Sequence, residues 1–246
     1  MIKFSIVTTC MNSAKSITQT INSVNKQSNV DIEHIFIDGG SSDDTLHIIK
    51  KIAKRNPIIL SDKDKGTYDA MNKGIKIASG DYILFLNSDD QLDRSNILNI
   101  VSKELKKDPD IFFASTKMIK PKNGKQFIWH PSDPNKYPFL FQQNPHPSTF
   151  VKISFLKKCK YLFPIKYKIC SDLHQQLVLI YKYSAKVLIS NLIVTNMALG
   201  GASTLNKMMI IKNTIEAYRV FKENFNNAAL LFTTQRLLKK LNRLNL

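Results

Sequence analysis

The sequence has few cysteines, no long apolar run and no glycine-rich phosphate motif. Its three cysteines (Cys10, Cys159 and Cys170) are an odd number without metal-ligand spacing, which favours reduced thiols over a disulfide framework or a zinc site. No stretch reaches the ~18 consecutive apolar residues that span a bilayer. Residues 1–10 are apolar but lack a following small-residue cleavage pattern, which favours a first buried strand over a signal peptide. We therefore expect a cytoplasmic protein.

The missing phosphate-binding fingerprints argue against two enzyme classes. Gly39-Gly40 is not followed by the third glycine of a dinucleotide-binding turn, and no GxxxxGK[ST] segment occurs. A nicotinamide dehydrogenase and a P-loop ATPase are therefore disfavoured.

Acidic residues are scarce in the second part of the chain. Residues 101–246 hold 24 lysines and arginines against 7 acidic residues, whereas residues 1–100 hold 12 of each, so the whole net charge of +17 arises after residue 100. Such asymmetry is typical of a protein with an anionic partner, such as nucleic acid, lipid headgroups or a polyphosphate. A lysine-rich surface that only solvates the protein is the alternative interpretation.

Two kinds of segment alternate along the first part of the chain. Apolar and β-branched runs predict strands at residues 4–9, 32–37, 58–60, 82–86 and 111–114. Apolar residues at helical spacing predict helices at residues 13–25, 45–55, 68–78 and 97–105. This alternation predicts the α/β fold class, with a Rossmann-like, mostly parallel sheet flanked by helices.

The pattern changes after residue 116. Residues 117–147 contain six prolines and predict a long excursion with a short hairpin around Gly124, rather than an independent domain. Helical spacing resumes over residues 172–183, a further segment follows at 186–194, and the chain from residue 207 onward is helical in spacing.

Polar and acidic residues follow several of the predicted strands. Ligands of an open parallel sheet bind outside the carboxyl ends of its strands, so these residues are candidates for one site. They are Thr8, Thr9, Asp38, Asn87, Ser88, Asp89 and Asp90. Clustered carboxylates need a compensating cation, and oxygen ligands with few histidines suit Mg²⁺ or Mn²⁺, which bridges carboxylates to a diphosphate. Asp43 and Asp44 are better explained as helix caps.

The motifs together resemble those of a known family. The segments SIVTT with Asn12, IDGGSSDDT, DKGTYDAMNKGI and GDYILFLNSDD are similar to family 2 glycosyltransferases of the GT-A fold, and most similar to bacterial enzymes that build surface polysaccharides. The later segments HPSTF, ICSD and GGAS (residues 146–150, 169–172 and 200–203) follow in the same order. The resemblance covers roughly residues 1–205.

The resemblance implies a division of the chain into regions. Residues 1–205 are expected to form the GT-A catalytic domain, with a nucleotide-sugar-binding half at 1–116 and an acceptor-side half at 117–205. Residues 206–246 form a basic helical C-terminal extension.

The resemblance also implies a reaction and residue roles. The expected enzyme is an inverting, hexosyltransferase-type glycosyltransferase that moves a sugar from a nucleotide-diphosphate sugar to a saccharide or lipid-linked saccharide hydroxyl. Thr8, Thr9 and Asp38 are expected at the nucleotide base and Asp69 at the donor site. Asn87-Ser88-Asp89 matches the family's DxD motif, so Asp89 is expected to bind Mn²⁺ or Mg²⁺.

On the acceptor side, Asp172 matches the family's catalytic base, and His146 is expected to line the site. Two residues depart from the family pattern. Asn87 leaves the metal one charged ligand fewer, for which Asp90 is a candidate substitute, and Asp44 stands where glycine is common.

Other interpretations of these residues remain open. Asp172 also suits the N-cap of the helix that follows, and a lone histidine such as His146 is often structural. A catalytically silent nucleotide-sugar-binding relative is conceivable because of Asn87. The charge favours a nucleic-acid-binding protein, but no such module occurs and carboxylates would repel a phosphate backbone, so we expect no nucleic acid partner.

The end of the chain has the pattern of a basic amphipathic helix. Leu230, Leu237, Leu241 and Leu244 recur at helical spacing, with basic residues between them at 236, 239, 240 and 243. Such a helix can lie at an anionic membrane surface, here at the inner face of the cell membrane through residues 229–246. Docking on its own domain or on a second subunit is the alternative.

Overall fold

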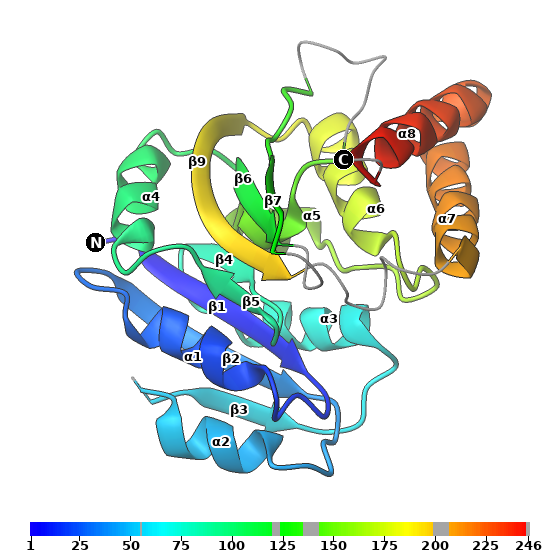
Figure 1. The fold of residues 1–246 in the computed structure, drawn as a ribbon. Helices are drawn as coiled ribbons and strands as arrows, with labels where there is room; N and C mark the ends of the chain where they lie inside the picture. The colour runs from blue at the N-terminus through cyan, green and yellow to red at the C-terminus, as the bar shows by residue number, and fades with distance from the viewer. Residues whose placement is uncertain (55, 120–123, 135–142, 199–206, 245–246) are drawn as a thin grey trace.

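The computed structural model describes residues 1–54, 56–119, 124–134, 143–198 and 207–244, with the backbone alone at 207 and 239–244. The first part of the chain forms four parallel strands in the order β3-β2-β1-β4 (Figure 1). The strands are β1 (Lys3–Cys10), β2 (Asp31–Asp38), β3 (Ile58–Ser61) and β4 (Tyr82–Phe85). The helices between and after them are α1 (Ile17–Asn25), α2 (Thr45–Ile52), α3 (Thr67–Ile77) and α4 (Ile97–Leu105). The predicted α/β alternation is confirmed.

The predicted start of the first helix was wrong by four residues. The backbone N–H groups of Ser13 and Ala14 donate to Thr45 Oγ1 and Asp43 Oδ2 at 2.7 and 3.1 Å, so the chain follows the neighbouring loop before α1 begins at Ile17. Asp43 also accepts from the backbone N–H of Thr45 at 3.0 Å. These contacts agree with the predicted structural role of Asp43 at the start of α2.

The second part of the chain completes the sheet. The full order is β3-β2-β1-β4-β8-β6-β9-β5, with β7 pairing with β6. The added strands are β5 (Asp90–Leu92), β6 (Ile111–Ile119), β7 (Gln126–Trp129), β8 (Thr149–Lys152) and β9 (Val187–Ala198). The hairpin predicted around Gly124 is confirmed, because β6 and β7 are antiparallel and Ile119 lies opposite Gln126. The sequence patterns did not predict β5 or β8.

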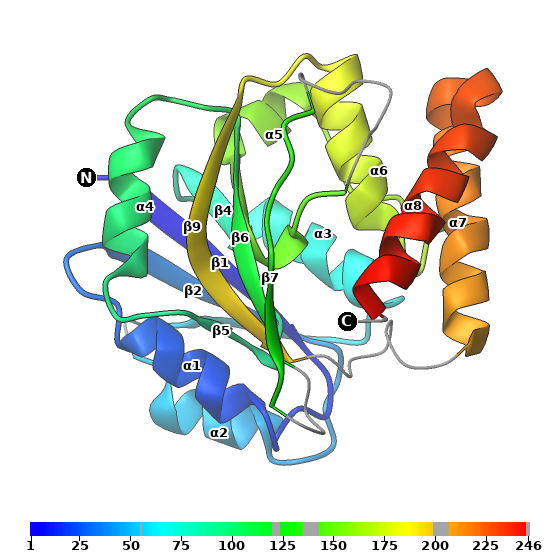
Figure 2. The same cartoon turned by 45° about the horizontal axis from the view of Figure 1, so that its top comes forward.

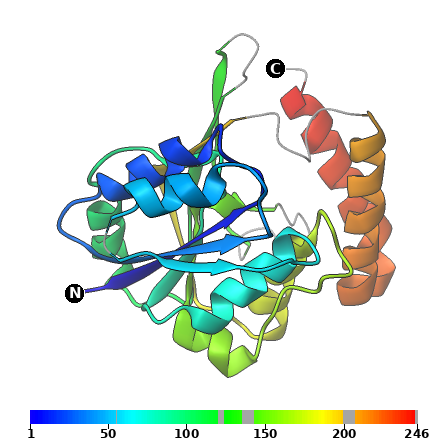
Figure 3. The same cartoon turned by 90° about the horizontal axis from the view of Figure 1, so that it is seen from below.

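Strand β8 determines which loops lie together. It is antiparallel to β4 on one side and to β6 on the other, whereas β6 and β9 are parallel. The carboxyl ends of β1, β2, β4, β6 and β9 and the amino end of β8 therefore lie at one edge of the sheet. In Figure 3, β1, β2 and β3 run from the side of the N terminus toward the side that carries α7 and α8.

The second part of the chain also contributes the remaining helices. They are α5 (Ile153–Cys159), α6 (Ser171–Leu177), α7 (Lys207–Phe225) and α8 (Ala229–Leu244), with the 3₁₀ turn η1 (His146–Ser148) before β8. A π-helical stretch, Val178–Lys182, continues α6. Helices α7 and α8 form a hairpin beside α6 (Figures 1 and 2), which confirms the predicted helical character of the C-terminal region. In the described residues, no helix combines the length and the apolarity needed to cross a membrane.

The unpredicted strand β8 is also central to the hydrophobic core. Phe150 is fully buried, and its ring lies 5.7 Å from that of Phe4 and 5.9 Å from that of Phe112. One strand from the second part of the chain therefore packs against β1 and β6 at once.

We expect Phe150→Ala to lower the free energy of unfolding by about 3–5 kcal/mol, because it removes a buried ring and leaves a cavity. Denaturant unfolding measures the change. Ile128→Ala on the exposed hairpin, where Ile128 is 42% exposed, is the control, and we expect it to change stability by less than about 0.5 kcal/mol. Equal losses for the two variants would contradict the central place of β8.

Candidate functional site

The ends of β1 and β4 are joined by side chains that the sequence predicted as site residues. Thr9 Oγ1 donates to Asn87 Oδ1 at 3.5 Å, and the hydroxyls of Ser13 and Ser88 lie 2.9 Å apart. Asn87 Nδ2 in turn donates to Asp90 Oδ2 at 3.2 Å. The structure thus brings Thr9, Asn87 and Ser88 together at the sheet edge. Thr8, by contrast, is fully buried and its hydroxyl lies 3.0 Å from His34 Nε2, below that edge.

Asp38 organises the loop after β2. Its side chain is fully buried, and its carboxylate accepts hydrogen bonds from Ser61 Oγ at 2.7 Å, from the Gly40 and Ser41 backbone N–H groups at 3.1 and 3.0 Å, and from Ser41 Oγ. Burial alone raises the pKa of this carboxyl, but the hydrogen bonds outweigh burial and hold the pKa below its ordinary value of 3.8. The carboxylate therefore fixes the shape of the loop beside Thr9 and Asn87.

The two adjacent carboxylates after β4 occupy different environments. Asp89 is exposed, whereas Asp90 begins β5 and is 1% exposed. Burial, with the nearby charge of Asp89, raises the pKa of Asp90 to about 8. Asp90 Oδ1 is buried without a hydrogen-bond partner in the described part of the chain. Only Asp89 is presented to solvent at the end of β4.

The residues present fit a divalent ion only in part. Within the described ranges, no group of three or more His, Cys, Asp or Glu side chains is arranged to hold a metal. Mg²⁺ and similar ions need only one or two protein carboxylates when a bound diphosphate and water supply the other oxygens. The exposed carboxylate of Asp89 suits such an ion.

Asp69 lies in the first turn of α3 and closes the loop before it. Its Oδ2 accepts from the backbone N–H of Lys65 at 3.0 Å, and Asp64 Oδ1 accepts from that of Gly66 at 2.8 Å. Asp64 also lies against the glycine after β2, because a Cβ on Gly39 would come within 2.7 Å of Asp64 Oδ2. The loops after β2 and β3 are therefore in contact, and Asp69 binds the backbone of the loop after β3.

Asp172 is held by two side chains from distant parts of the chain. Its Oδ1 accepts from Tyr68 Oη at 3.2 Å and from the backbone N–H of Leu173 at 2.8 Å, and its Oδ2 accepts from Gln143 Nε2 at 2.6 Å. The N-cap of α6 is Cys170, so Asp172 stands in the first turn and is not the cap. The alternative of a capping role is thus wrong.

His146 packs against the end of β4. Its ring stacks on Phe85 at 5.6 Å and lies edge-on to Phe163 at 6.0 Å. Burial lowers its pKa, and the charge of Asp172 opposes that shift. Neither ring nitrogen has a hydrogen-bond partner among the described residues, although the side chain is only 8% exposed. The structure therefore places His146 and Asp172 on the β4–β8 side of the edge.

Sequence reasoning missed Gln143 and the hydroxyl of Tyr68. Tyr68 belongs to the DKGTYDAMNKGI segment, but nothing in the pattern marked its hydroxyl, whose single hydrogen is shared between Asp172 Oδ1 and the Ile169 carbonyl oxygen 2.9 Å away. Gln143 stands in a proline-rich excursion without any motif signal. Residues 200–203, the last quoted motif, lie outside the described residues.

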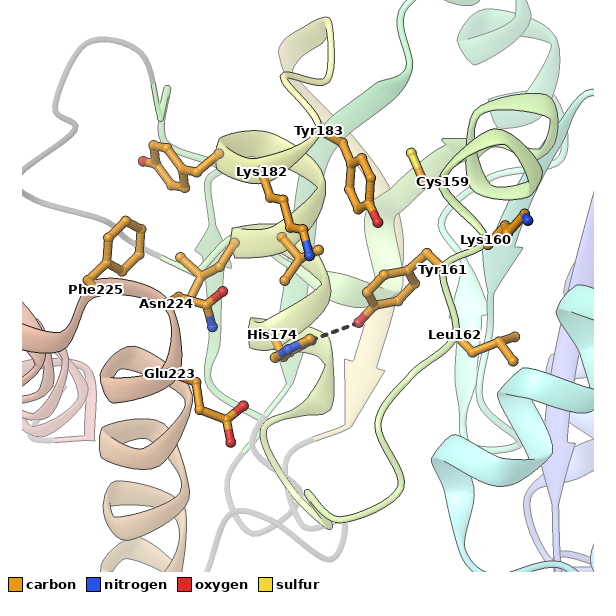
Figure 4. Close-up of a pocket in the computed structure, with 13 residues that line it drawn as sticks. Cys159, Lys160, Tyr161, Leu162, His174, Lys182, Tyr183, Glu223, Asn224 and Phe225 are labelled. Carbon is orange, nitrogen blue, oxygen red and sulfur yellow. Dashed lines mark hydrogen bonds between the residues drawn. The ribbon is translucent and has the colours of Figure 1, made fainter.

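A cavity of about 630 Å³ lies between α5, α6 and the end of α7 (Figure 4). It is lined by Tyr161, His174 and Glu223 among others, and Tyr161 Oη lies 3.1 Å from His174 Nδ1. None of the predicted site residues lines this cavity. His174, although two residues from Asp172, therefore belongs to a different environment.

Comparison with known proteins identifies the family. The model of glycosyl transferase family 2 matches residues 5–160, so the chain belongs to that family. A PGL/p-HBAD biosynthesis glycosyltransferase of Mycobacterium tuberculosis is 39% identical over 98 residues, which are 39% of this chain and 38% of the relative. A poly-beta-1,6-N-acetyl-D-glucosamine synthase of Staphylococcus aureus is 37% identical over 87 residues, 35% of this chain and 21% of that protein. The matches thus span well under half the length of these relatives.

Solved structures share the fold. TarS 1–349 of S. aureus in complex with UDP-GlcNAc superimposes with a TM-score of 0.67 at 20% identity, over 98% of this chain and 72% of that one. The mannosyltransferase PcManGT of Pyrobaculum calidifontis, in complex with GDP-Man and Mn²⁺, gives a TM-score of 0.65 at 13% identity, over 95% and 68% of the two chains. The GT-A fold expected from the sequence is confirmed.

We expect Asp38→Asn to destabilise the protein by about 1–3 kcal/mol at neutral pH, because the loop's hydrogen-bond donors lose a charged acceptor. The folded state lowers the pKa of Asp38, so the stabilisation is present above pH 3.8 and is lost as the pH falls below it. Unfolding midpoints of wild type and variant should therefore converge in acid. Asp31→Asn, at the exposed start of β2, controls for net charge, and a difference that persists unchanged at low pH would contradict the assignment.

Proposed function

We propose that the protein transfers a sugar from a nucleoside-diphosphate sugar to a saccharide hydroxyl, with inversion at the anomeric carbon. The observation that carries this proposal is the pairing of two features at one sheet edge. An exposed carboxylate, Asp89, follows β4, and a second carboxylate, Asp172, is oriented by Tyr68 and Gln143 on the side of β8. Family membership supports the reaction class.

The donor side is assigned to the ends of β1, β2 and β4. We place the nucleotide base against the loop that Asp38 holds, beside Thr9, with Asp69 bordering the donor through the loop before α3. The roles of Thr8 and Asp38 are then to shape the pocket, because both side chains are buried. The UDP-GlcNAc and GDP-Man complexes of the structural neighbours favour a nucleotide sugar without deciding which one.

Asp89 is the proposed protein ligand of Mn²⁺ or Mg²⁺. Asn87 and Ser88 hold the turn, since the amide of Asn87 is engaged with Thr9 and Asp90 and the hydroxyl of Ser88 lies beside that of Ser13. We assign Asp90 the role of holding Asn87 in this turn, because its carboxyl is buried and accepts a hydrogen bond from the Asn87 amide. When bound, the ion offsets the charge that develops on the departing nucleoside diphosphate.

Asp172 is the proposed general base. Tyr68 and the Leu173 amide occupy Oδ1, while Oδ2 accepts one hydrogen bond, from Gln143, and keeps a lone pair for an acceptor hydroxyl. A base aligned in this way contributes roughly 10²–10⁴-fold to the rate. His146 would line the acceptor side with its unpaired ring nitrogens.

A lipid-linked acceptor at an anionic membrane is the proposed context. The relatives include a PGL/p-HBAD biosynthesis glycosyltransferase and a poly-beta-1,6-N-acetyl-D-glucosamine synthase, which favours an acceptor in the biosynthesis of a larger glycoconjugate. Leu230, Leu231 and Leu238 of α8 are 67%, 51% and 62% exposed, so the hairpin presents apolar side chains to its surroundings. Basic residues at 239, 240 and 243 follow on the same helix. Arg236 is excluded from this surface, because it points toward Gln143.

We expect Asp172→Asn to lower kcat for sugar transfer by about 10²–10⁴-fold while leaving nucleotide affinity within about twofold, because the amide cannot take the acceptor proton. Asp89→Ala should instead weaken Mn²⁺-dependent binding of the nucleoside diphosphate. Product formation from a panel of nucleotide sugars and calorimetric titration with UDP and GDP measure the two effects.

Asp31→Asn, on an exposed residue at the amino end of β2, is the matched control. A protein that binds the nucleotides but forms no product with any donor would contradict the transfer reaction and favour a silent relative. An Asp172→Asn variant with wild-type kcat would contradict its role as base.

We expect the triple substitution of Leu230, Leu231 and Leu238 by serine to reduce co-sedimentation with vesicles containing phosphatidylglycerol by roughly tenfold or more, because burial of each leucine contributes ~1.5–3 kcal/mol. Raised salt should weaken wild-type binding as well, since basic residues contribute ~1 kcal/mol each. Ile128→Ser on β7 is the control. Unchanged sedimentation of the triple variant at low salt would contradict membrane binding through α8.

A further inference from the structure

The α7–α8 hairpin contacts the segment that presents Asp172 in two separate places. The first contact is made by Glu216, in the middle of α7. Its Oε1 accepts from the backbone N–H of Lys168 at 3.0 Å, and its Oε2 accepts from those of Ile169 and Cys170 at 2.8 and 3.1 Å. One carboxylate thus binds three successive backbone N–H groups immediately before α6.

This arrangement fixes the backbone from which Asp172 projects. Donors at a helix start otherwise need a capping side chain or water, and α6 has no side-chain cap of its own. Cys170 Sγ also lies 3.4 Å from the carbonyl oxygen of Asn213 on α7. The segment immediately before α6 is therefore held by α7.

The second contact is made by Arg236 on α8. Its Nη1 donates to Asn213 Oδ1 at 2.5 Å and its Nη2 donates to Gln143 Oε1 at 2.6 Å. Gln143 Nε2 then donates to Asp172 Oδ2 at 2.6 Å. The chain of hydrogen bonds runs from the C-terminal helix to the carboxylate of Asp172 through one amide.

Arg236 and the carboxylate of Asp172 select the same orientation of that amide. A glutamine amide carries an acceptor oxygen and a donor nitrogen, and either end fits the same space. An arginine offers only donors and stays charged, so it selects the oxygen and leaves the NH₂ group for Asp172. A residue without a donor at position 236 would leave the amide oxygen of Gln143 without this partner, so that Asp172 alone would orient the amide.

The cost of placing an arginine here indicates that the contact matters. Arg236 is half-buried, and its Nε is buried without a hydrogen-bond partner among the described residues. Its neighbours in the contact are neutral amides, not a carboxylate that would compensate the charge directly. An apolar side chain would pack at this position without that desolvation cost.

We propose that Arg236 and Glu216 are positioning residues for Asp172, so that the C-terminal hairpin completes the acceptor side of the site. The inference rests on the proposed role of Asp172 as base. Glu216 sets the backbone of Asp172 and Arg236 sets the amide that occupies one lone pair of Oδ2. The other lone pair of Oδ2 then faces a fixed direction for the acceptor hydroxyl.

The activity test uses Arg236→Met and Arg236→Lys in the full chain. We expect Arg236→Met to lower kcat roughly 10- to 100-fold, because small displacements of a catalytic group have effects of this size. Arg236→Lys keeps a donor and should recover part of the loss. Affinity for UDP, measured by calorimetry, should change less than about twofold, since the donor side is untouched.

Arg219→Met removes the same charge from an exposed position on α7 and should behave as wild type. If Arg236 acts through Gln143, then adding Arg236→Met to Gln143→Met should cause little further loss of kcat. Multiplied losses in the double variant, or wild-type kcat in Arg236→Met, would overturn the role of Arg236. Thermal unfolding of each variant identifies a loss that comes from misfolding.

A second measurement does not depend on activity. Glu216→Gln should accelerate hydrogen exchange of the backbone amides of Lys168, Ile169 and Cys170, because it weakens their common acceptor, whereas Glu223→Gln on the same helix should not, since Glu223 pairs with Lys166. Unchanged hydrogen-exchange rates in Glu216→Gln would overturn the proposed contact between α7 and the segment before α6, independently of any measured activity. A wild-type chain that transfers no sugar, with the exchange result as expected, contradicts the proposed function instead.

Discussion

The antiparallel insertion of β8 between β4 and β6 is the constraint from which the geometry of the site follows. A strand parallel to β4 at this position would start at the opposite edge of the sheet. Because β8 is antiparallel, η1 with His146 and the preceding Gln143 emerge beside the carboxyl end of β4. The full burial of Phe150 between Phe4 and Phe112 holds this strand in place.

The same pairing explains how the two sides of the proposed site come to lie at one edge of the sheet. The proposed donor side depends on loops after parallel strands, which are held by Asp38, Asn87 and Ser13. The proposed acceptor side depends on α6, which follows β8 in the chain, and on the hairpin that binds the segment before α6 through Glu216. Several of the few acidic residues after residue 100 bind groups of the same chain. The side chain of Asp108 binds that of Lys152, Asp110 accepts from the backbone N–H of Lys186, and Glu223 binds the side chain of Lys166.

The sequence predicted the first four strands and their helices well, because the apolar period of each element is local. It missed β8, whose four residues follow a proline-rich excursion and whose partners lie more than 35 residues away in the chain. It expected Asp89 to bind the metal but did not predict that Asp90 is buried, because that burial accompanies the pairing of β5 with β9. It counted Arg236 among membrane-facing charges, since its partner Gln143 lies 93 residues earlier.

Anomalous diffraction at the manganese edge, from crystals of the protein grown with UDP and Mn²⁺, tests the central claim most directly. The account predicts one manganese peak within coordinating distance of the Asp89 carboxylate and of the diphosphate, with Asp172 facing the same bound molecule from the β8 side. A nucleotide bound in the cavity between α5, α6 and α7, or a manganese ion away from Asp89, would contradict it.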